Sequence, residues 1–590
     1  MAPAVRRSQR TPAPTPAREQ AAQPAKVAKA KTTKKAAPKQ AAAGPQANTA
    51  AKRTAATAAP KANAAAKPKA AQASDSEGPK KRGRPKATDT EAPKKTAAKR
   101  KQEDDSDASP DAKRTKKTEE STTAQPKAAA KPKAAPKPKA APKPKAAPKP
   151  KAVVNGPRFT EKLNVYVFGE GSNAELGLGT AKNCVDVKRP RLNPFLPADT
   201  VGVVRVATGG MHCLALTYDN QIYSWGVNDQ GALGRDTTWD DDANMRDVDA
   251  DSDSDSDDGN KTNGLNPLES TPMPILAECF PENTNFVDIA AGDSVSLALT
   301  DTGLVYGWGT FRRNEGILGF SETSKVQERP VLIPELSKIT QIACGANHSL
   351  AIDKTGKVKA WGSGQQNQLG RRMTERGLIT GLTPTNVSFK DGRRNQAIRD
   401  VACGQYHSLA IGVDGRVWSF GANNFGECGI PESAGKNNAI VETPQLVTSL
   451  GNNVISLSGG SHHNVAVTNQ GECLVWGRLD GQQIGQPVAN VPQSSVLNDS
   501  TGHPKILIVP TAVPNLHNIV AATCGSDHSI AITGSGQAYS WGFSANYQTG
   551  LGTDEDVEVA TLIDNTAVKG KHLTWAGAGG QFSVLTSLAQ

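Results

Sequence analysis

One repeated pattern constrains the fold of this chain more than any other feature. Its skeleton is Gly-x-x-His-x-x-Ala, followed by a Trp-Gly or Phe-Gly pair and then by Leu-Gly. Successive first glycines are 53–65 residues apart, with one spacing of 83 residues. These anchor glycines are Gly209, Gly292, Gly345, Gly404, Gly460, Gly525 and Gly579. A period of this length indicates a supersecondary unit that is repeated along the chain.

The aromatic residue of each repeat lies sixteen residues after its anchor, at Trp225, Trp308, Trp361, Phe420, Trp476 and Trp541. The seventh anchor, Gly579, reaches the end of the sequence before its aromatic. The missing half lies near residue 165, where the run VYVFG contains Phe168. The pattern therefore predicts that an N-terminal strand completes the last unit.

Each unit contains a hairpin. The run from His348 to Ile352 is a short apolar strand, and a second strand ends at Trp361. Between them a Gly, or once Asn220, lies five residues before each aromatic, where a tight turn requires positive φ. With flanking strands, each unit forms one four-stranded blade. Seven blades in a closed ring leave no long exposed sheet edge. We predict an all-β, seven-bladed propeller closed by the N-terminal strand.

Composition divides the chain at about residue 157. Residues 1–157 contain no Phe, Trp, Tyr or Cys and carry 38 Lys and Arg against 12 Asp and Glu. The remaining residues, 158–590, carry 31 against 45, so a basic tail precedes an acidic body. The tail cannot bury enough apolar surface to offset its ordering entropy, and we predict that it is disordered.

Several kinds of protein do not fit this sequence. The start, MAPAVRRSQR, lacks the apolar region of a secretory signal, and no apolar run is long enough to span a membrane. The eight cysteines show no Cys-x-x-Cys spacing, which favours small buried thiols in a reducing compartment. No phosphate-cradling Gly-x-x-x-x-Gly-Lys-Ser/Thr motif and no metal cluster is present, so we assign the chain no cofactor and no metal.

The basic tail contains three kinds of motif. Arg82, Gly83, Arg84 and Pro85 form an AT-hook-like sequence that suits a narrow A·T minor groove, although the same residues also fit a nuclear-localisation cluster. Two further clusters resemble a bipartite nuclear import signal: Lys99, Arg100 and Lys101, then Lys113, Arg114, Lys116 and Lys117. Repeats of AAPKPK extend to Lys151 and resemble linker-histone tails. Dense positive charge without aromatics predicts contact with DNA phosphates, and the open alternative is an inert solubilising linker.

The spacing of 83 residues arises from an insertion at about 239–260 that contains DVDADSDSDSDD. A block of like charges is typical of a solvated loop. The functional alternative is a phosphorylatable acidic arm that competes for the basic tail or binds histones.

Four stretches within residues 160–590 carry more than the generic repeat: GGMHCLALTYDNQIYSWGVNDQGALGRDT, AGDS, WGTFRRNEGILG and SGGSHH. On these stretches the sequence resembles the regulator of chromosome condensation family, whose members are chromatin-bound nucleotide exchange factors for the small GTPase Ran. The resemblance implies a chromatin-tethered monomer in the nucleus. Its product, nuclear Ran-GTP, would serve nucleocytoplasmic transport and spindle assembly. Exchange of this kind involves no covalent chemistry, so no enzyme activity is expected.

One loop is longer than the repeat allows. In six units the Gly of Leu-Gly lies nine residues after the aromatic, but after Trp308 it lies eleven away, at Gly319. The resemblance implies that this loop is the β-wedge that enters the GTPase near its nucleotide site. Its residues are Phe311, Arg312, Arg313, Asn314, Glu315, Gly316, Ile317 and Leu318.

Two polar residues, Asp293 and His462, depart from the repeat and match exchange residues of the family, and Asn424 matches another of its GTPase-facing positions. Positions equivalent to Asp293 hold Gly, Ala, Gln or Ser. Asn347 stands where the family typically has a second catalytic Asp, and Phe582 replaces an expected His. The template histidines, such as His348, are interpreted as structural residues.

The loop after Gly370, RRMTERGL, resembles a family loop whose arginines engage the histone acidic patch, which implies this role for Arg371, Arg372 and Arg376. The expected partners are therefore Ran, nucleosomes or core histones, DNA through the tail, and a nuclear import receptor. Two alternatives remain at this point: a chromatin-binding propeller without exchange activity, and a propeller of the plant ultraviolet-receptor type. Only Trp239, Trp418 and Trp575 lie outside the template, which argues against the second.

Overall fold

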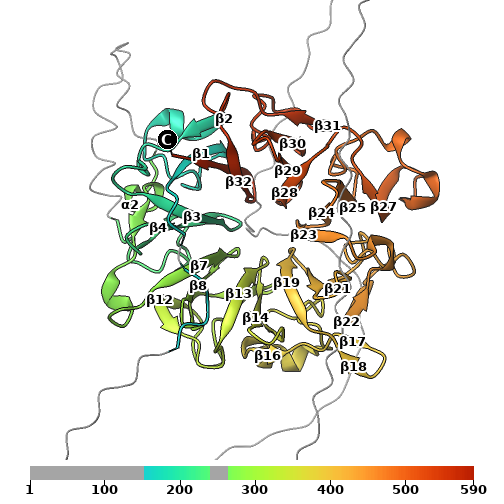
Figure 1. The fold of residues 1–590 in the computed structure, drawn as a ribbon, viewed down its shortest axis with the longest axis horizontal. Coiled ribbons are helices and arrows are strands. Elements are labelled where there is room, and N and C mark those ends of the chain that lie inside the picture. Colours follow the sequence, from blue (N-terminus) through green and yellow to red (C-terminus); the bar gives the residue numbers. More distant parts are fainter. Residues whose placement is uncertain (1–151, 158, 240–263, 590) are drawn as a thin grey trace, which may run out of the picture. The chain divides into compact units, whose positions relative to one another are not determined.

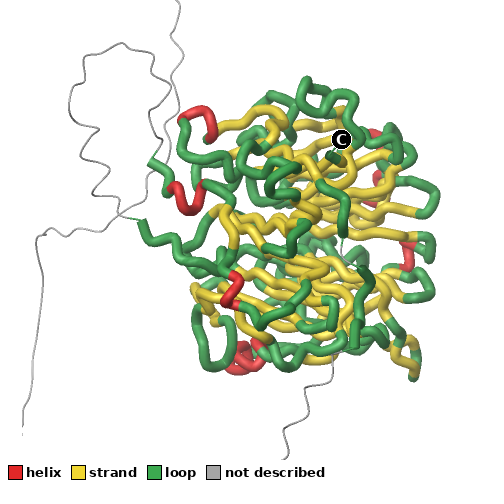
Figure 2. The backbone as a smooth tube through the Cα atoms, turned by 60° about the vertical axis from the view of Figure 1, so that its left-hand side comes forward, coloured by secondary structure: helices red, strands yellow, loops and turns green. Residues whose placement is uncertain are grey.

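The computed structural model describes residues 152–157, 159–239 and 264–589. Seven sheets of four or five strands surround a central axis as blades (Figure 1). Strands fill the body, and the helical segments are short and lie at its periphery (Figure 2). The predicted seven-bladed all-β propeller is confirmed. None of the described helices is long and apolar enough to cross a membrane.

Each blade runs from an inner to an outer strand. The innermost strands are β3 (Val203–Thr208), β7 (Phe286–Ala291), β13 (Ile339–Cys344), β19 (Ile398–Cys403), β23 (Val454–Gly459), β28 (Ile519–Cys524) and β32 (Leu573–Ala578). The second strands are β4 (His212–Thr217), β8 (Val295–Thr300), β14 (His348–Asp353), β20 (His407–Gly412), β24 (His463–Thr468), β29 (His528–Thr533) and β33 (Phe582–Leu588). The third strands are β5 (Ile222–Gly226), β9 (Val305–Gly309), β15 (Val358–Gly362), β21 (Val417–Ala422), β25 (Cys473–Arg478), β30 (Ala538–Gly542) and β1 (Leu163–Glu170).

The outer strands are more irregular: β6 (Met273–Pro274), β12 (Gln327–Leu332), β16 (Thr385–Asn386), β22 (Ile440–Leu446), β27 (Pro504–Ala512) with β26 (Val496–Asn498), β31 (Val557–Leu562) and β2 (Asp186–Leu192). Two small hairpins project between strands, β10 (Phe311–Arg313) with β11 (Gly316–Gly319), and β17 (Lys390–Asp391) with β18 (Arg394–Asn395). The helical segments are α2 (Pro267–Ser270), η1 (Lys182–Cys184), η3 (Ala277–Cys279), η4 (Glu375–Leu382), η5 (Thr448–Leu450), η6 (Val488–Asn490) and η7 (Gln493–Ser495).

The two ends of the propeller share one blade. Strand β1 pairs antiparallel with β33 from Leu163 opposite Leu588 to Gly169 opposite Phe582. In Figure 1 the first strands, in teal, lie beside the last strands, in dark red. The N-terminal strand therefore supplies the third strand of this blade, with Phe168 in the place of the template aromatic. The predicted closure is confirmed.

The glycines of the repeat have two physical roles. The hairpin turns have φ of +74° at Gly303, +77° at Gly356 and +72° at Asn220, as the sequence predicts. The Gly of Leu-Gly has another function, because it lies against the aromatic ring of the next blade. A β-carbon at residue 234 would lie 2.8 Å from Trp308 Nε1, so glycine allows the ring to pack closely.

Each blade is also bonded to its neighbour. The indole Nε1 of Trp308 donates to the carbonyl of Ala232 at 2.7 Å, and Trp541 donates to Gln483 at 2.8 Å. The template histidines are buried, and each reaches a polar residue on the second strand of the next blade through Nε2. These pairs are His212–Ser296, His348–Ser408, His407–Asn464, His463–Ser529 and His528–Ser583, at 2.6–2.9 Å. The interpretation of the template histidines as structural residues agrees with this geometry.

Burial has the expected effect on these histidines. Desolvation lowers the pKa of His212 and His463 to about 4 and the pKa of His348 and His528 to about 3. Phe582, which replaces the last template histidine, packs in one apolar cluster with Cys213 of the next blade. Where Phe582 replaces the polar histidine of one blade, the next blade thus provides the apolar Cys213.

A short segment before the first strand is bound to the propeller. The backbone amides of Val154 and Asn155 donate to the carbonyl of Asp301 at 2.8 and 2.9 Å. The side chain of Asn155 donates to Thr300 of one blade and to Ile339 of the next. These contacts begin a few residues before the boundary at 157 that composition predicts. The AT-hook-like motif, both import clusters, the AAPKPK repeats and nearly all of the acidic insertion lie outside the described residues.

Candidate functional site

Loops of two kinds gather at one end of the propeller. Neighbouring strands are antiparallel, so the loop after the first strand of a blade and the loop after its third strand emerge at the same end. Loops of the first kind hold Asp293, Asn347 and His462, and loops of the second kind hold the wedge and Asn424. Chain topology therefore brings the sequence-predicted exchange residues to one face, which we call the exchange face.

The centre of this face is lined by the anchor glycines. They surround a cavity of about 250 Å³ along the axis, together with Asp293, Cys344 and Cys403. The peptides around the cavity are bonded from blade to blade, as in the 2.9 Å bond from the amide of Asp293 to the carbonyl of Ala346. A β-carbon at Gly209 would lie 2.1 Å from the carbonyl oxygen of Gly292. Glycine is therefore required at the anchors for space.

Asp293 is partly buried beside this cavity. Its carboxylate lies above Gly210, where an added β-carbon would be 2.5 Å from Oδ1. Asn347 Nδ2 donates to Asp293 Oδ2 at 3.3 Å. Burial raises the pKa of Asp293, and the nearby charge of Arg312 and the bond from Asn347 partly oppose that rise. Within the described residues, the hydrogen bond to this carboxylate comes from Asn347.

The lengthened loop after Trp308 forms the hairpin β10–β11. Phe311 and Leu318 are buried at its base, whereas residues 312–315 are exposed at its tip. Arg312 pairs with Ile317 across the hairpin, and Arg313 pairs with Gly316. The hairpin is therefore a projecting strand pair with an apolar base and a charged tip. This is the form that the resemblance to a β-wedge implies.

Asn347 connects the wedge to Asp293. Its Oδ1 accepts a 2.7 Å bond from the backbone amide of Arg312, and its Nδ2 donates to Asp293. The amide side chain therefore uses both its acceptor and its donor. An aspartate here could accept from Arg312 but would place a second negative charge beside Asp293. The replacement of the family's Asp by Asn suits this bridging geometry.

The tip of the wedge is supported by a residue that the sequence did not reveal. Gln365, in the loop after β15, accepts from the amide of Asn314 at 2.9 Å and donates to the Glu315 carboxylate at 3.3 Å. Arg313 also forms an ion pair with Glu315 at 3.5 Å. Gln365 occupies a variable position of the repeat, so only its place beside the wedge identifies it.

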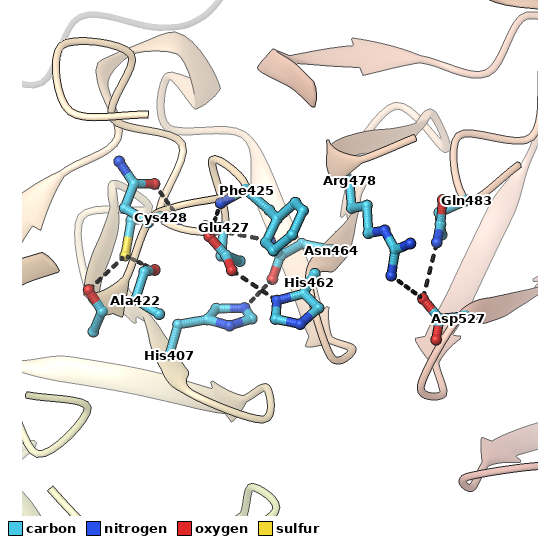
Figure 3. Close-up of polar contacts among 12 residues, drawn as sticks. His407, Ala422, Phe425, Glu427, Cys428, His462, Asn464, Arg478, Gln483 and Asp527 are labelled. Carbon is cyan, nitrogen blue, oxygen red and sulfur yellow. Dashed lines mark hydrogen bonds and ion pairs between the residues drawn. The ribbon is translucent and has the colours of Figure 1, made fainter. Parts of the chain in front are cut away.

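His462 lies on the other side of the exchange face. Its Nδ1 is 2.9 Å from Oε1 of Glu427, a carboxylate with no exposed surface, whereas 23% of the His462 side chain is exposed. The rings of Phe425 and Tyr406 lie 4.5 and 6.4 Å from the imidazole. Figure 3 shows His462 directed at Glu427 and next to the ring of Phe425.

Asn424 follows β21 in the same loop as Phe425 and Glu427 and is partly exposed. The buried neighbour Asn423 holds this loop, because its Nδ2 donates to the carbonyl of Ile430 and its Oδ1 accepts from the amide of Cys428. The sequence-predicted Asn424 and His462 are therefore presented by adjacent loops of two blades.

The three arginines after Gly370 have different surroundings. Arg371 is half-buried, and its Nη1 donates to the carbonyl of Ala360 at 3.3 Å. Arg372 and Arg376 are exposed. The following segment, η4, contributes Leu378 to the same apolar cluster as Phe311 at the base of the wedge. The arginine loop and the wedge thus rest on one shared base.

The cysteines do not form a second site. All eight are free thiols, and burial raises the pKa of Cys344 and Cys524 to about 12. Among the described residues, no group of three His, Cys, Asp or Glu side chains is placed to hold a metal ion.

Comparison with known proteins gives consistent matches across the propeller. Residues 164–585 match the RCC1-like domain family. The guanine nucleotide exchange factor SRM1 of Saccharomyces cerevisiae is 42% identical over 432 residues, which cover 72% of this chain and 87% of that protein.

Two solved structures are similar to the propeller. One is Prp20p from Saccharomyces cerevisiae, described with its binding properties to Gsp1p and histones, which is 39% identical with a TM-score of 0.65 and covers 73% of this chain and 92% of that chain. The other is yeast RCC1 (Prp20) bound to Kap60, also 39% identical with a TM-score of 0.65, which covers 76% of this chain and 96% of that chain. The chain therefore belongs to the RCC1-like domain family, in the branch of the regulator of chromosome condensation.

Proposed function

We infer that this chain is a guanine-nucleotide exchange factor for the small GTPase Ran that acts on nuclear chromatin. Its relative SRM1 is named a guanine nucleotide exchange factor, and Prp20p is described with its binding properties to Gsp1p and histones. The structural observation that supports this inference most directly is the hydrogen-bond network from Asp293 through Asn347 to the wedge. It joins a partly buried carboxylate to a projecting charged hairpin on one face.

The proposed mechanism is differential binding and involves no covalent step. A factor that binds the nucleotide-free GTPase more tightly than the nucleotide-bound form shifts the population toward release. The wedge, with its apolar base fixed in the propeller, supplies a rigid projection that can displace phosphate-binding elements of the GTPase. Asp293 supplies a fixed acceptor for donors that the GTPase exposes as nucleotide leaves. The direction of net exchange follows from the cellular excess of GTP over GDP.

The arginine loop is proposed to bind the histone acidic patch through Arg372 and Arg376, because these two side chains are exposed. Arg371 is proposed to orient the loop through its bond to Ala360. For the tail we propose DNA contact and recognition by a nuclear import receptor, which its basic clusters support. The structure of yeast RCC1 (Prp20) bound to Kap60 also supports the second role.

The direct test is stimulated nucleotide release. Ran loaded with a fluorescent GDP analogue is mixed with catalytic amounts of the full chain and excess GTP, and fluorescence decay is followed. We expect release well above the spontaneous rate. Release at the spontaneous rate, with the propeller folded and histones bound, would support the alternative of a chromatin scaffold without exchange activity.

A second test separates the tail from the propeller. We expect deletion of residues 1–151 to weaken DNA binding strongly and to leave release from free Ran nearly unchanged. The segment with Asn155 is kept because it is bonded to two blades. Tail binding should weaken with salt at a log–log slope of about −0.9 per phosphate neutralised. Equal DNA affinity of the truncated and full chains would contradict this assignment.

A further inference from the structure

Glu427 occupies a position of the repeat that has a common structural task. In five blades a Glu or Gln two residues before the Gly of Leu-Gly accepts a bond from a backbone amide of its own turn. The pairs are Glu175 with Asn173, Gln368 with Gln366, Glu427 with Phe425, Gln483 with Gly481 and Gln548 with Asn546, at 2.8–3.0 Å. One side-chain oxygen is sufficient for this task, and three blades perform it with Gln.

The second oxygen of Glu427 is therefore available for another partner, and that partner is His462. Oε1 lies 2.9 Å from His462 Nδ1 on the next blade. The backbone of Glu427 is fixed as well, because its carbonyl accepts from Trp476 Nε1 at 3.0 Å and from Asn464 Nδ2 at 2.8 Å. The carboxylate is therefore buried, and the backbone that carries it is held in place by these two bonds.

The neighbouring blade shows the same geometry with the opposite chemistry. There Gln483 Nε2 donates to Asp527 Oδ1 at 2.9 Å, and Asp527 occupies the position equivalent to His462. Figure 3 shows the two pairs side by side, one with a carboxylate facing an imidazole and one with an amide facing a carboxylate. In these two blades the template residue is thus matched to the variable residue that it meets.

We propose that Glu427 is a positioning residue for exchange, which fixes His462 with its proton on Nδ1 and its Nε2 directed to the GTPase. This inference rests on the proposed exchange function. A carboxylate can only accept, so the nitrogen that faces it carries the proton. In the neutral imidazole, Nε2 is then an acceptor. Phe425 and Tyr406 flank the ring and limit its rotation.

The substitution Glu427→Gln separates this role from the structural one. Gln at 427 can keep the bond from the Phe425 amide through its oxygen, as Gln368, Gln483 and Gln548 do on their own turns. Its NH₂ group then faces His462 Nδ1 and requires that nitrogen to accept. The proton moves to Nε2, and the outward nitrogen changes from acceptor to donor.

The matched control is Glu175→Gln. Glu175 occupies the same repeat position, is also buried and holds the same kind of turn. The residue equivalent to His462 beside it is Met211, so the control changes a carboxylate to an amide without changing an imidazole.

The experiment measures Ran-GDP release and the ¹⁵N signals of histidine-labelled full-length chain, with His462→Ala used to assign the His462 signals. We expect Glu427→Gln to slow stimulated release about tenfold or more, which corresponds to the loss of one hydrogen bond. The protonated nitrogen of His462 should move from Nδ1 to Nε2. Glu175→Gln should change neither quantity.

Two results overturn the proposal: release at the wild-type rate in Glu427→Gln, or slower release with the His462 signals unchanged. A wild-type chain that fails to accelerate release would instead overturn the proposed function. The His462 signals would still report in that case whether Glu427 sets the tautomer.

Discussion

His462 and His463 are neighbours in the chain and have opposite surroundings. His463 is a template residue, has 1% of its surface exposed and bonds to Ser529 of the next blade. His462 is partly exposed, stands between two aromatic rings and meets a buried carboxylate. Two consecutive residues at the start of one strand therefore differ: His463 bonds one blade to the next, and His462 is partly exposed on the exchange face.

The same contrast recurs around the exchange face. Asn347 precedes the template residue His348, and Asp527 precedes His528. In each pair the second residue bonds to the second strand of the next blade, and the first bonds to a loop of the preceding blade. The repeated position therefore serves the folding of the ring, and we expect the variable position before it to serve binding.

The largest effect is expected at the wedge. Shortening residues 312–317 by two residues, to the template length, should reduce stimulated Ran-GDP release to the spontaneous rate. Phe311 and Leu318 remain to fill the apolar base, so the melting temperature should change little. If the shortened chain lost exchange only because it unfolded, the wedge would be needed for folding, and it could not be counted among the surface residues that serve exchange.

Asp293→Asn should have the next largest effect on exchange. A charge-assisted hydrogen bond contributes roughly 1.5–3 kcal/mol, so release should slow about ten- to a hundredfold if one such bond forms in the exchange transition state. Stability should behave differently. Burial raises the pKa of Asp293, which means that its ionised form is less favourable in the folded than in the unfolded chain.

At neutral pH the neutral amide should therefore leave the melting temperature unchanged or raise it. Release and thermal unfolding measured on the same preparation test both statements. A lower melting temperature together with proportionally slower release would show that Asp293 serves folding, which is contrary to its assignment.

Paired alanine substitutions at His462 and His463 test the contrast directly. His463→Ala removes a buried bond and leaves Ser529 without its imidazole partner, at a cost of about 1–3 kcal/mol in the free energy of unfolding. His462→Ala should instead slow release about tenfold with a smaller change in stability. Denaturant unfolding and Ran-GDP release, measured on both variants, decide the matter. If the two variants lost the same stability and the same release rate, the distinction between a structural His463 and an exchange residue His462 would be wrong.

The sequence was sufficient to predict the fold, because the fold depends on the period of the repeat, whereas the exchange residues were assigned through the family resemblance. Positive φ at Gly303 and the two extra residues in the loop after Trp308 follow from spacing alone. Asp293 stands out in the sequence because the repeat does not require a carboxylate at its position, and its proposed role in exchange rests on the family resemblance. Gly303 follows the sequence repeat, whereas the loop after Trp308 and Asp293 depart from it, and both kinds of position can be recognised from the sequence.

Some residues are of the type that the repeat requires and also contact a proposed site residue. The sequence pattern alone could not identify these residues. Glu427 is the residue type that its turn requires, and its second oxygen has a partner only in the next blade. Gly210 lacks a side chain and so leaves room for the Asp293 carboxylate. Arg371 and Arg372 are adjacent in sequence, yet only the folded loop turns the first toward Ala360. Contacts between blades decide these roles.

The smallest expected effect concerns acid stability, which should depend on the template histidines. The folded-state pKa is about 3 for His348 and His528 and about 4 for His212 and His463, below the ordinary value near 6.5. Between these values the unfolded chain binds protons that the folded chain does not, so the free energy of unfolding falls as pH decreases below about 6.5. Each such histidine contributes at most about 1.4 kcal/mol per pH unit.

His348→Gln should therefore flatten this slope by one proton, while its amide can still donate to Ser408. Denaturant unfolding at pH 7, 6 and 5 for the variant and the wild type gives the difference in slope, in which the contributions of the other titrating groups cancel. Release at pH 7 should be unchanged, since His348 lies behind the exchange face in a bond between blades. The same dependence of the unfolding free energy on pH in both chains would mean that His348 titrates alike in the folded and unfolded states. The template histidines would then not be buried neutral residues, and the contrast with His462 would fail.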